Sequence, residues 1–274
     1  ISMGGNISFL NVALARQLSI TNIFIGSKRH LSSGDFSAHL TLLPTREEHN
    51  VVMKMSPSLT EPTRLAQQGK FLRAQLQCKA SDKVYLIAIG GDGAGYRYDK
   101  KSCEQLAQLM IKISKNENCK WLLTTSRRTG VKIEQALQAL IPSHLLLDSV
   151  WWGSSPRKVM DAYLGLANRI FISIDSMSML SEAIASGKPT LLLQPDSAAP
   201  SKRYQQTLKR YCQAKYCAIH QLSDALIPPF YSSSTPLQVA REDLLDQLSP
   251  LLENIANQAH VTNRHPDIHL LTWS

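Results

Sequence analysis

Several features are scarce or missing in this chain of 274 residues, and each absence narrows its possible functions. The sequence has no apolar run of about 18 residues or more, which excludes a membrane-spanning helix, and no stretch patterned like a secretory signal peptide. The five cysteines include no C-x-x-C pair, which indicates reduced structural thiols and neither a zinc site nor a disulfide framework. The histidines show no metal-ligand spacing. We therefore expect a cytoplasmic protein without a metal site.

Acidic residues are also in deficit, with 21 against 30 basic ones and a net charge of +9. Such a balance attracts phosphates on nucleotides, on nucleic acid or on anionic lipid headgroups, and alone it does not choose among them. Five basic residues fall in one predicted helix between Lys202 and Lys215, with Tyr204 and Tyr211 interleaved. This helix is either a solvated face or a contact surface for an anionic membrane, so a peripheral position on the inner face of the membrane is one alternative.

The length favours two domains, and helical and extended patterns alternate along the whole chain. In the first part, the spacing of apolar residues predicts helices at 7–18 and 61–77 and strands at 22–26 and 38–44. The chain reaches a Gly-Gly-Asn loop directly after its first three residues, as if at the end of a strand, so we expect the N-terminal lobe to be incomplete. The polar stretch 78–83 is the expected domain boundary.

The second part alternates more regularly. Apolar strands are predicted at 84–89, 121–125, 145–148, 169–174 and 190–193, with helices at 101–114, 131–140, 157–166 and 178–186. This alternation predicts a parallel sheet covered on both faces. A loop at 228–236 and a long helix at 237–258 follow.

The expected fold class is therefore α/β, with two Rossmann-like lobes that contain parallel sheets. Residues 1–78 form a partial N-terminal lobe and residues 79–234 a C-terminal nucleotide-binding lobe. Residues 235–274 form a helix and tail that cross back to the N-terminal lobe.

A glycine-rich turn, Gly90-Gly91-Asp92-Gly93-Ala94-Gly95, follows the strand at 84–89. Glycines let the backbone approach a phosphate closely, and ligands of open α/β sheets bind at the carboxyl ends of the strands. The turn is not G-x-G-x-x-G and lacks the Walker lysine, so neither a dinucleotide fold nor a P-loop is predicted. Gly90 and Gly91 are candidates for contact with phosphate or sugar, and the alternative is a flexible surface turn.

A second polar segment, Thr124-Thr125-Ser126-Arg127-Arg128-Thr129, also lies at the end of a predicted strand. Hydroxyl groups and guanidinium groups just before a helix suit an oxyanion, because the helix dipole and free N–H groups add to their attraction. Ser126, Arg127 and Arg128 are therefore candidate phosphate contacts. The alternative is a simple cap by Thr129 with solvated arginines.

The segment from Ile174 to Pro189 carries the most specific pattern. Its strand ends at Asp175, and Ser176, Met177 and Ser178 open a helix whose first amides can hold a diphosphate. Glu182 follows two turns later, where its carboxylate can accept hydrogen bonds from ribose hydroxyls. The alternative is that Ser178 is only a cap and Glu182 is solvated.

Trp151-Trp152-Gly153 follows the strand at 145–148. These rings either stack on a nucleotide base or pack at a domain interface.

The segment up to Pro189 resembles the nucleotide-sugar-binding segment of GT-B glycosyltransferases, notably the branch that adds N-acetylglucosamine to the peptidoglycan lipid precursor. In that pattern a Ser-Gly-rich turn leads to a helix whose glutamate binds the ribose, and Gly-x-Pro follows. Glu182, Gly187 and Pro189 match the pattern, whereas Asp175-Ser176 stand where it has Ser-Gly.

More closely, the chain resembles bacterial members of the mitochondrial-fission family named for its elongated-mitochondria mutant, the ELM-type family. The matching elements are Gly4-Gly5-Asn6, Ile89-Gly90-Gly91, Thr124 to Thr129, and Asp175 to Pro189. The resemblance implies a GT-B-like fold, a place for Gly4, Gly5 and Asn6 at the cleft, and further strand–helix units ahead of them. The family has no well-defined reaction, so the resemblance implies a fold more than a function.

The leading hypothesis is a GT-B-type glycosyltransferase-like protein that binds a nucleotide-sugar between two lobes and acts on an envelope glycolipid. The expected partners are a nucleoside diphosphate-sugar as donor substrate and a lipid-linked acceptor or anionic membrane surface, without nucleic acid or a separate cofactor. Arg127, the Gly90-Gly91 turn and the amides near Ser176 to Ser178 would stabilise the departing diphosphate. The general base would come from the N-terminal lobe, where no residue identifies it.

Two other classes are weighed against this hypothesis. One is a non-catalytic adaptor that keeps the fold. The other is a sugar-nucleotide epimerase, which would need the dinucleotide glycine fingerprint and a Tyr-x-x-x-Lys pair, and the sequence has neither.

Overall fold

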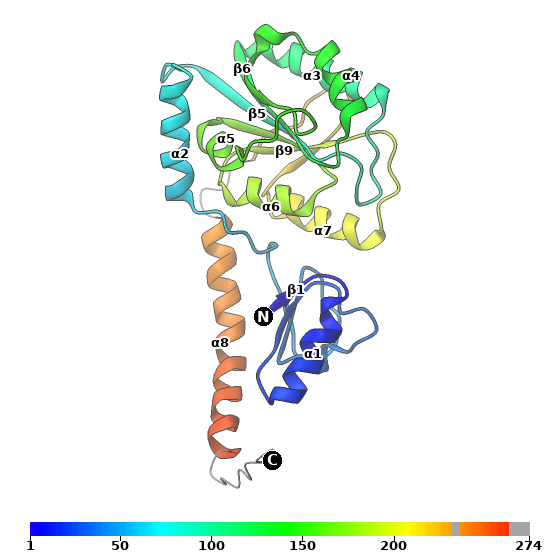
Figure 1. Ribbon diagram of the computed structural model, residues 1–274, viewed down its shortest axis with the longest axis vertical. Coiled ribbons are helices and arrows are strands. Elements are labelled where there is room, and N and C mark those ends of the chain that lie inside the picture. The colour runs from blue at the N-terminus through cyan, green and yellow to red at the C-terminus, as the bar shows by residue number, and fades with distance from the viewer. Residues whose placement is uncertain (232–235, 263–274) are drawn as a thin grey trace, which may run out of the picture. The chain divides into compact units, whose positions relative to one another are not determined.

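The computed structural model describes residues 1–231 and 236–262, and the chain divides into two compact units (Figure 1). The first unit contains Ile1–Lys54 together with the described residues from Val239 onward, and the second contains Met55–Gln238. Each unit has one sheet, and every strand pair in both sheets is parallel. The α/β class with two parallel sheets, predicted from the sequence, is confirmed.

The first unit has four short strands in the order β1-β2-β3-β4, namely Ser2–Met3, Ile23–Ile25, Ala38–Thr41 and Asn50–Val52. Helix α1 (Ile7–Leu18) connects the first two strands, and a 3-10 turn, η1 (Ser33–Asp35), precedes β3. The rings of Phe24 and Phe36 stack at 5.0 Å between their centroids and form part of the core.

Helix α8 (Pro236–Thr262) packs on the sheet of the first unit. Leu244, Leu248 and Leu251 recur at helical spacing and contact the buried residues of β3 and β4. Lys54 and Asp243 form an ion pair of 2.9 Å beside this contact. The expected tail beyond residue 262 lies outside the described residues.

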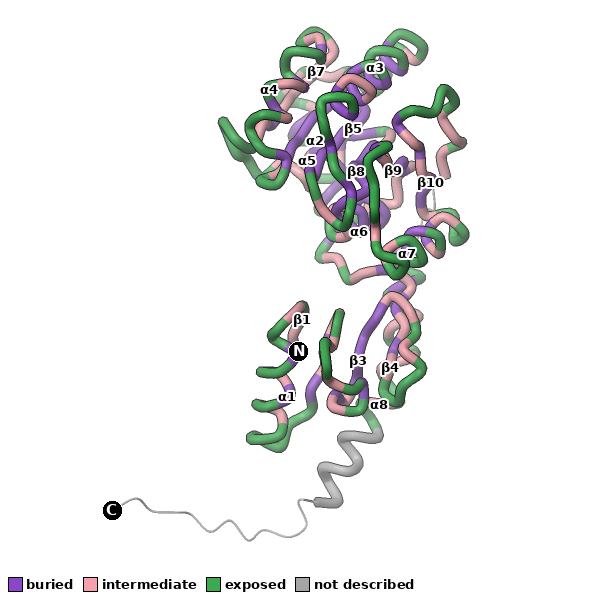
Figure 2. The backbone as a smooth tube through the Cα atoms, turned by 90° about the vertical axis from the view of Figure 1, so that its right-hand side faces the viewer, coloured by how far each residue is buried: buried purple, intermediate pink, exposed green. Residues whose placement is uncertain are grey.

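The second unit has six strands in the order β10-β9-β8-β5-β6-β7. Their bounds are Lys83–Ile89 (β5), Cys119–Thr125 (β6), Leu146–Val150 (β7), Arg169–Ser173 (β8), Thr190–Gln194 (β9) and Ala218–Gln221 (β10). In β5 every residue after Lys83 is buried, as expected for a central strand with helices on both faces (Figure 2). The strand order reverses between β5 and β8, and such switch points are where ligands bind in doubly wound sheets.

Six longer helices and one 3-10 turn accompany this sheet: α2 (Pro62–Gln75), α3 (Lys100–Glu117), α4 (Val131–Leu140), η2 (Ser143–Leu145), α5 (Met160–Leu166), α6 (Met177–Ala185) and α7 (Lys202–Gln213). The side chain of Asp99 caps α3 by accepting the N–H of Ser102. In the same way Ser201 caps α7 by accepting the N–H of Tyr204.

Helix α2 packs against α5 so closely that two glycines face each other. A Cβ added to Gly165 would overlap the carbonyl oxygen of Leu65 and lie 2.8 Å from the nitrogen of Gly69. This contact assigns α2 to the second unit, and the division of the chain falls between Lys54 and Met55. The sequence-based boundary at 78–83 lies after α2, because that polar stretch resembles a linker more than the segment before α2 does.

Two strands and several element boundaries differ from the sequence-based expectation. Strand β3 ends at Thr41 instead of residue 44, and α3 continues to Glu117 instead of residue 114. Strands β4 and β10 are short and were not expected, and helix α5 begins at Met160 instead of residue 157. Arg157 instead forms an ion pair of 2.8 Å with Asp148 on β7, which holds the segment before α5 along the end of that strand. The expected loop at 228–236 lies partly outside the described residues, and the long final helix is α8.

Candidate functional site

Three polar segments meet at the switch point of the second sheet. Gly90 follows β5, Ser126 follows β6 and Asp175 follows β8, so parallel pairing brings them to one edge. The N–H of Gly90 donates to Ser173 Oγ at 2.6 Å, and Ser126 Oγ donates to the carbonyl of Gly90. The candidate segments that are far apart in the sequence are thus joined by direct hydrogen bonds.

Arg128 and Asp175 form an ion pair beneath the glycine-rich turn. The distance from Arg128 Nη2 to Asp175 Oδ2 is 2.7 Å, and Arg128 Nη1 donates to the carbonyl of Asp92 at 3.1 Å. The Asp175 side chain is fully shielded from solvent, whereas the Arg128 side chain is 42% exposed. Burial raises the pKa of the Asp175 carboxyl, although Ser173 and Arg128 pull it down.

The glycines of this turn are required by internal packing. A Cβ on Gly90 would overlap the Asp175 carboxylate, and one on Gly91 would lie 2.5 Å from the backbone carbonyl oxygen of Arg128. Gly91 also has a φ of +101°, which side chains rarely adopt. The turn is therefore a packed element that seats Arg128 and Asp175, and its contact with phosphate stays a prediction.

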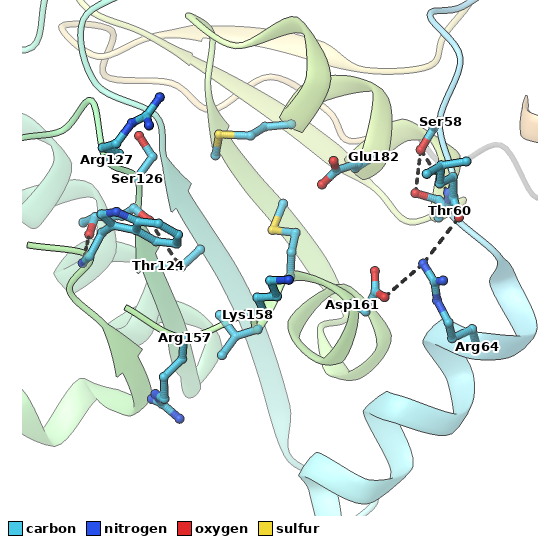
Figure 3. Close-up of a pocket in the computed structure, with 16 residues that line it drawn as sticks. Ser58, Thr60, Arg64, Thr124, Ser126, Arg127, Arg157, Lys158, Asp161 and Glu182 are labelled. Carbon is cyan, nitrogen blue, oxygen red and sulfur yellow. Dashed lines mark hydrogen bonds and ion pairs between the residues drawn. The ribbon is translucent and has the colours of Figure 1, made fainter. Parts of the chain in front are cut away.

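A pocket of about 600 Å³ opens beside this cluster, entirely within the second unit (Figure 3). Ser126 and Arg127 lie on one side of it, and Thr60, Arg64 and Asp161 lie on the other. The full lining is Ser58, Leu59, Thr60, Arg64, Thr124, Thr125, Ser126, Arg127, Trp152, Arg157, Lys158, Val159, Met160, Asp161, Met179 and Glu182.

The charges around the pocket are unevenly paired. Arg64 and Asp161 form an ion pair of 3.0 Å, and Arg157 is paired with Asp148. In the segments that the structure describes, neither Arg127 nor Lys158 forms an ion pair or a side-chain hydrogen bond. Two cationic side chains at the pocket are therefore free to meet an anion.

Glu182 contributes a carboxylate to the pocket from α6. Its side chain is half-buried, and burial raises the pKa of this carboxyl, with a further increase from the nearby Asp161 carboxylate. Its charged form is therefore disfavoured in the folded protein. A carboxylate in such a place gains from hydrogen-bond donors such as sugar hydroxyls.

The ring of Trp152 lies at the pocket with 37% of its surface exposed. The N–H of Trp152 donates to Thr125 Oγ1 at 2.8 Å, so the end of β6 holds this loop directly. The two alternatives for this ring, stacking on a base and packing at a domain interface, both stay predictions.

Two motifs from the sequence have structural functions. Lys188, in the Gly187-Lys188-Pro189 segment, donates to the carbonyls of Gly165 and Ala167 at the end of α5, and burial lowers its pKa to about 8. The tyrosines of α7 turn inward: Tyr204 donates to the carbonyl of Ile174 at 2.7 Å, and Tyr211 accepts the N–H of Ser56 at 3.0 Å. Exposed basic side chains therefore alternate on this helix with tyrosines that hydrogen-bond within the fold.

The sequence-based candidates fall into four groups. Ser126, Arg127 and Glu182 line the pocket, whereas Gly90, Gly91, Arg128 and Asp175 form the packed cluster beside it. Ser176, Met177 and Ser178 begin α6, and the Ser176 side chain does not cap that helix. Gly4, Gly5 and Asn6 begin α1 in the first unit, and their part in ligand binding stays a prediction.

Several pocket residues escaped the sequence-based search. Lys158 and Asp161 surround the start of α5. Ser58 and Thr60 come from the segment that leads into α2, and Arg64 lies in the first turn of that helix. The pair Arg157-Lys158 directly after the tryptophan turn was the one available signal, because adjacent basic residues near a strand end suit phosphate.

The described residues contain neither a metal-binding cluster nor a membrane-spanning helix. No group of three or more His, Cys, Asp or Glu suited to a metal ion occurs within residues 1–231 and 236–262. Over the same ranges, no helix combines the length and the apolarity needed to cross a membrane.

The two units with parallel sheets, one of them with a pocket at its switch point, place the protein among two-lobed α/β proteins of the GT-B-like class. Residues 38–241 match the family model described as mitochondrial fission ELM1, and the chain belongs to that family. The resemblance inferred from the sequence is thereby confirmed. No curated protein matches the sequence.

Solved structures provide a comparison of the fold. UDP-GlcNAc 2-epimerase from Methanocaldococcus jannaschii superposes with a TM-score of 0.51 at 13% identity, over 88% of this chain and 68% of that one. MurG from Acinetobacter baumannii gives a TM-score of 0.46 at 16% identity, over 91% of this chain and 63% of that one. ADP-heptose LPS heptosyltransferase II from E. coli gives a TM-score of 0.47 at 12% identity, over 93% of this chain and 76% of that one. The chain thus spans less than two thirds of the MurG chain.

Proposed function

We propose that the second unit binds the nucleoside diphosphate part of a nucleotide-sugar, and that the protein is a GT-B-type glycosyltransferase-like protein. The observation that supports this best is the pair of free cationic side chains, Arg127 and Lys158, in a pocket that also presents the half-buried Glu182. A sugar nucleotide needs these two kinds of group together, because its diphosphate is anionic and its ribose offers hydroxyl donors.

The parts of the ligand can be assigned to the parts of the pocket by their chemistry. Arg127 and Lys158 suit the diphosphate, and the first amides of α6 have no acceptor inside their helix. Glu182 suits the ribose hydroxyls, and the exposed face of Trp152 suits a base. The fold comparison supports the ligand class, since the Methanocaldococcus jannaschii protein that superposes on this chain is a UDP-GlcNAc 2-epimerase.

In the proposed reaction, the bond between the sugar's anomeric carbon and the diphosphate oxygen breaks while the acceptor oxygen bonds to that carbon. The electron pair goes to the diphosphate, whose negative charge increases as it departs. Arg127 and Lys158 would stabilise this charge more strongly than that of the bound substrate, which lowers the barrier. The acceptor proton goes to a general base to which we assign no residue.

An envelope glycolipid is the acceptor we propose, at the inner face of the membrane. The exposed side chains of Lys202, Arg203, Lys209 and Lys215 provide an attraction to anionic headgroups, at about 1 kcal/mol for each basic residue near the surface. Failure of the protein to co-sediment with phosphatidylglycerol vesicles would remove the membrane from this proposal.

A non-catalytic adaptor is the alternative function. The absence of measurable affinity for any sugar nucleotide would favour it.

Replacing Arg127 with alanine tests the ligand class. In calorimetry, we expect uridine 5′-diphosphate binding to weaken by about 1.5–3 kcal/mol, the range for charge-assisted hydrogen bonds. Lys132→Ala is the matched control, since Lys132 is exposed on α4, carries the same charge and lies outside the pocket. Equal losses in both variants would mean that only the overall charge matters.

Replacing Glu182 with glutamine separates a ligand contact from a structural one. The melting temperature of the free protein should stay the same or rise slightly, because the raised pKa of Glu182 shows that burial disfavours its charge. Nucleotide affinity should nevertheless fall by about 1–2 kcal/mol, since a charged acceptor for the ribose is lost. Unchanged affinity for every nucleotide that binds the parent would exclude Glu182 from the ligand site.

A further inference from the structure

Glu134, on α4, has a buried carboxylate that is hydrogen-bonded to the end of β6 and to the loop that follows β7. The residue is 3% exposed, it does not line the pocket, and no ion pair joins it to any residue in the part of the chain that the structure describes. A buried carboxylate without a cation is costly unless hydrogen-bond donors compensate for its lost hydration. The hydrogen-bond donors to the Glu134 carboxylate therefore identify the segment that this residue holds in place.

Those donors belong to the loop that carries Trp152 and to the strand end beneath it. The N–H of Gly153 lies 3.1 Å from Glu134 Oε1 and 3.0 Å from Oε2. Thr125 Oγ1 donates to Glu134 Oε1 at 2.6 Å and itself accepts the N–H of Trp152 at 2.8 Å. Two successive peptide N–H groups of the loop thus end on the same carboxylate, one directly and one through a hydroxyl.

The fit between the carboxylate and the loop is close. A Cβ on Gly153 would lie 2.7 Å from Glu134 Oε2 and 3.1 Å from a Val131 methyl carbon, so a side chain at this position would displace the carboxylate from the Gly153 N–H. The loop is closed as a tight turn, since the N–H groups of Ser154 and Ser155 both donate to the carbonyl of Trp151, at 3.1 and 2.9 Å. The Trp152 ring extends from this anchored turn to the pocket.

We propose that Glu134 is a positioning residue that holds the Trp152 ring at the pocket and so determines how tightly the base of the ligand is bound. This inference rests on the proposed function for the assignment of the base, but the anchoring of the loop does not depend on any ligand. Glu134 touches neither the base nor the phosphates. Replacement of Glu134 should therefore weaken the binding of the base and leave the binding of the phosphates unchanged.

The anchoring can be tested in the free protein by amide hydrogen exchange. In the parent, the amides of Trp152 and Gly153 should be protected, and in Glu134→Ala their exchange should accelerate by about tenfold or more, the factor for one lost hydrogen bond of ordinary strength. In Glu134→Gln the exchange rates should lie between those of the parent and those of Glu134→Ala, because an amide oxygen can still accept the Gly153 N–H. Unchanged exchange at both amides in both variants would overturn the anchoring.

The effect on the base is tested by comparing two ligands. For Glu134→Ala and Glu134→Gln we expect uridine 5′-diphosphate to bind less tightly, by about tenfold for alanine, within the range for loss of a base–aromatic stack. Inorganic pyrophosphate, which has no base, should bind all three proteins equally. A merely structural role would weaken both ligands together, and that result would overturn the proposal.

A double-mutant comparison makes the pathway explicit. With Trp152→Ala already present, Glu134→Gln should cause no further loss of uridine 5′-diphosphate binding, because the ring that it positions is gone. Additive losses would contradict the inference. If the parent binds neither ligand, the proposed function fails, and the exchange measurement still decides whether Glu134 anchors the loop.

Discussion

Replacing Gly165 with alanine is expected to lower the free energy of unfolding of the second unit by at least ~3 kcal/mol. The added methyl group would overlap the carbonyl oxygen of Leu65 and lie 2.8 Å from the nitrogen of Gly69. Both neighbours are backbone atoms of a packed helix, so neither can rotate away, and relief requires α2 and α5 to separate. Chemical denaturation followed by tryptophan fluorescence measures this loss, since Trp121, Trp151 and Trp152 all belong to that unit.

A matched glycine provides the control for this prediction. Gly34 has no atom nearer than 3.8 Å to an added Cβ, and its φ is not in the left-handed region. Gly34→Ala should therefore change stability by no more than about 0.5 kcal/mol. A Gly165→Ala protein as stable as Gly34→Ala would mean that α2 and α5 are not in this backbone contact.

Replacing Arg128 with methionine is the second change with a large expected effect. It leaves the carboxylate of Asp175 shielded from solvent without its cation, so we expect a loss of about 2–4 kcal/mol at neutral pH. The lower part of the range for buried pairs applies because Arg128 is itself 42% exposed. The double variant Arg128→Met/Asp175→Asn should recover much of the loss, because it removes the buried charge as well.

The loss should also depend on pH in a defined direction. The pKa of Asp175 is raised in the folded protein, so between its ordinary value and the raised one the folded state binds more protons than the unfolded state. Unfolding free energy therefore falls as pH rises through this window. Without Arg128 the pKa rises further and the window widens, so the difference between variant and parent should shrink on acidification. A difference that is constant with pH would show that Asp175 is not the cause.

Much of the fold could be predicted because the periodicity and the length of its apolar segments indicate the same helices and strands. Helices α1 and α4 have the expected bounds, and the apolar strands of the second sheet lie within a few residues of their predicted ranges. These segments are long enough to show a clear apolar period, which is the main local signal for a helix or a strand. Strand β4 has only three residues, and so short a segment carries too little period to distinguish it from a loop.

The candidate site could be predicted only in part, because neighbours in sequence have different surroundings. Arg127 and Arg128 are adjacent and chemically identical, yet one faces the pocket and the other is paired with Asp175. That difference arises from β8, which lies far along the chain, and no local pattern contains it. The same holds for Glu134, whose helical period marks it only as one residue of an amphipathic helix.

The order of the strands in the second sheet also has a consequence in time. Strand β5 is synthesised first but lies at the centre, and its neighbour β8 follows only after about 80 further residues. At a translation rate of roughly 5–20 residues per second, one edge of this largely apolar strand stays unpaired for on the order of 4–16 s before its partner is synthesised. During that interval its unpaired N–H and C=O groups can pair with any other extended chain. Production of this protein should therefore be limited more by the crowding of nascent chains than by the stability of the finished fold, and slower initiation or lower temperature should increase the soluble yield.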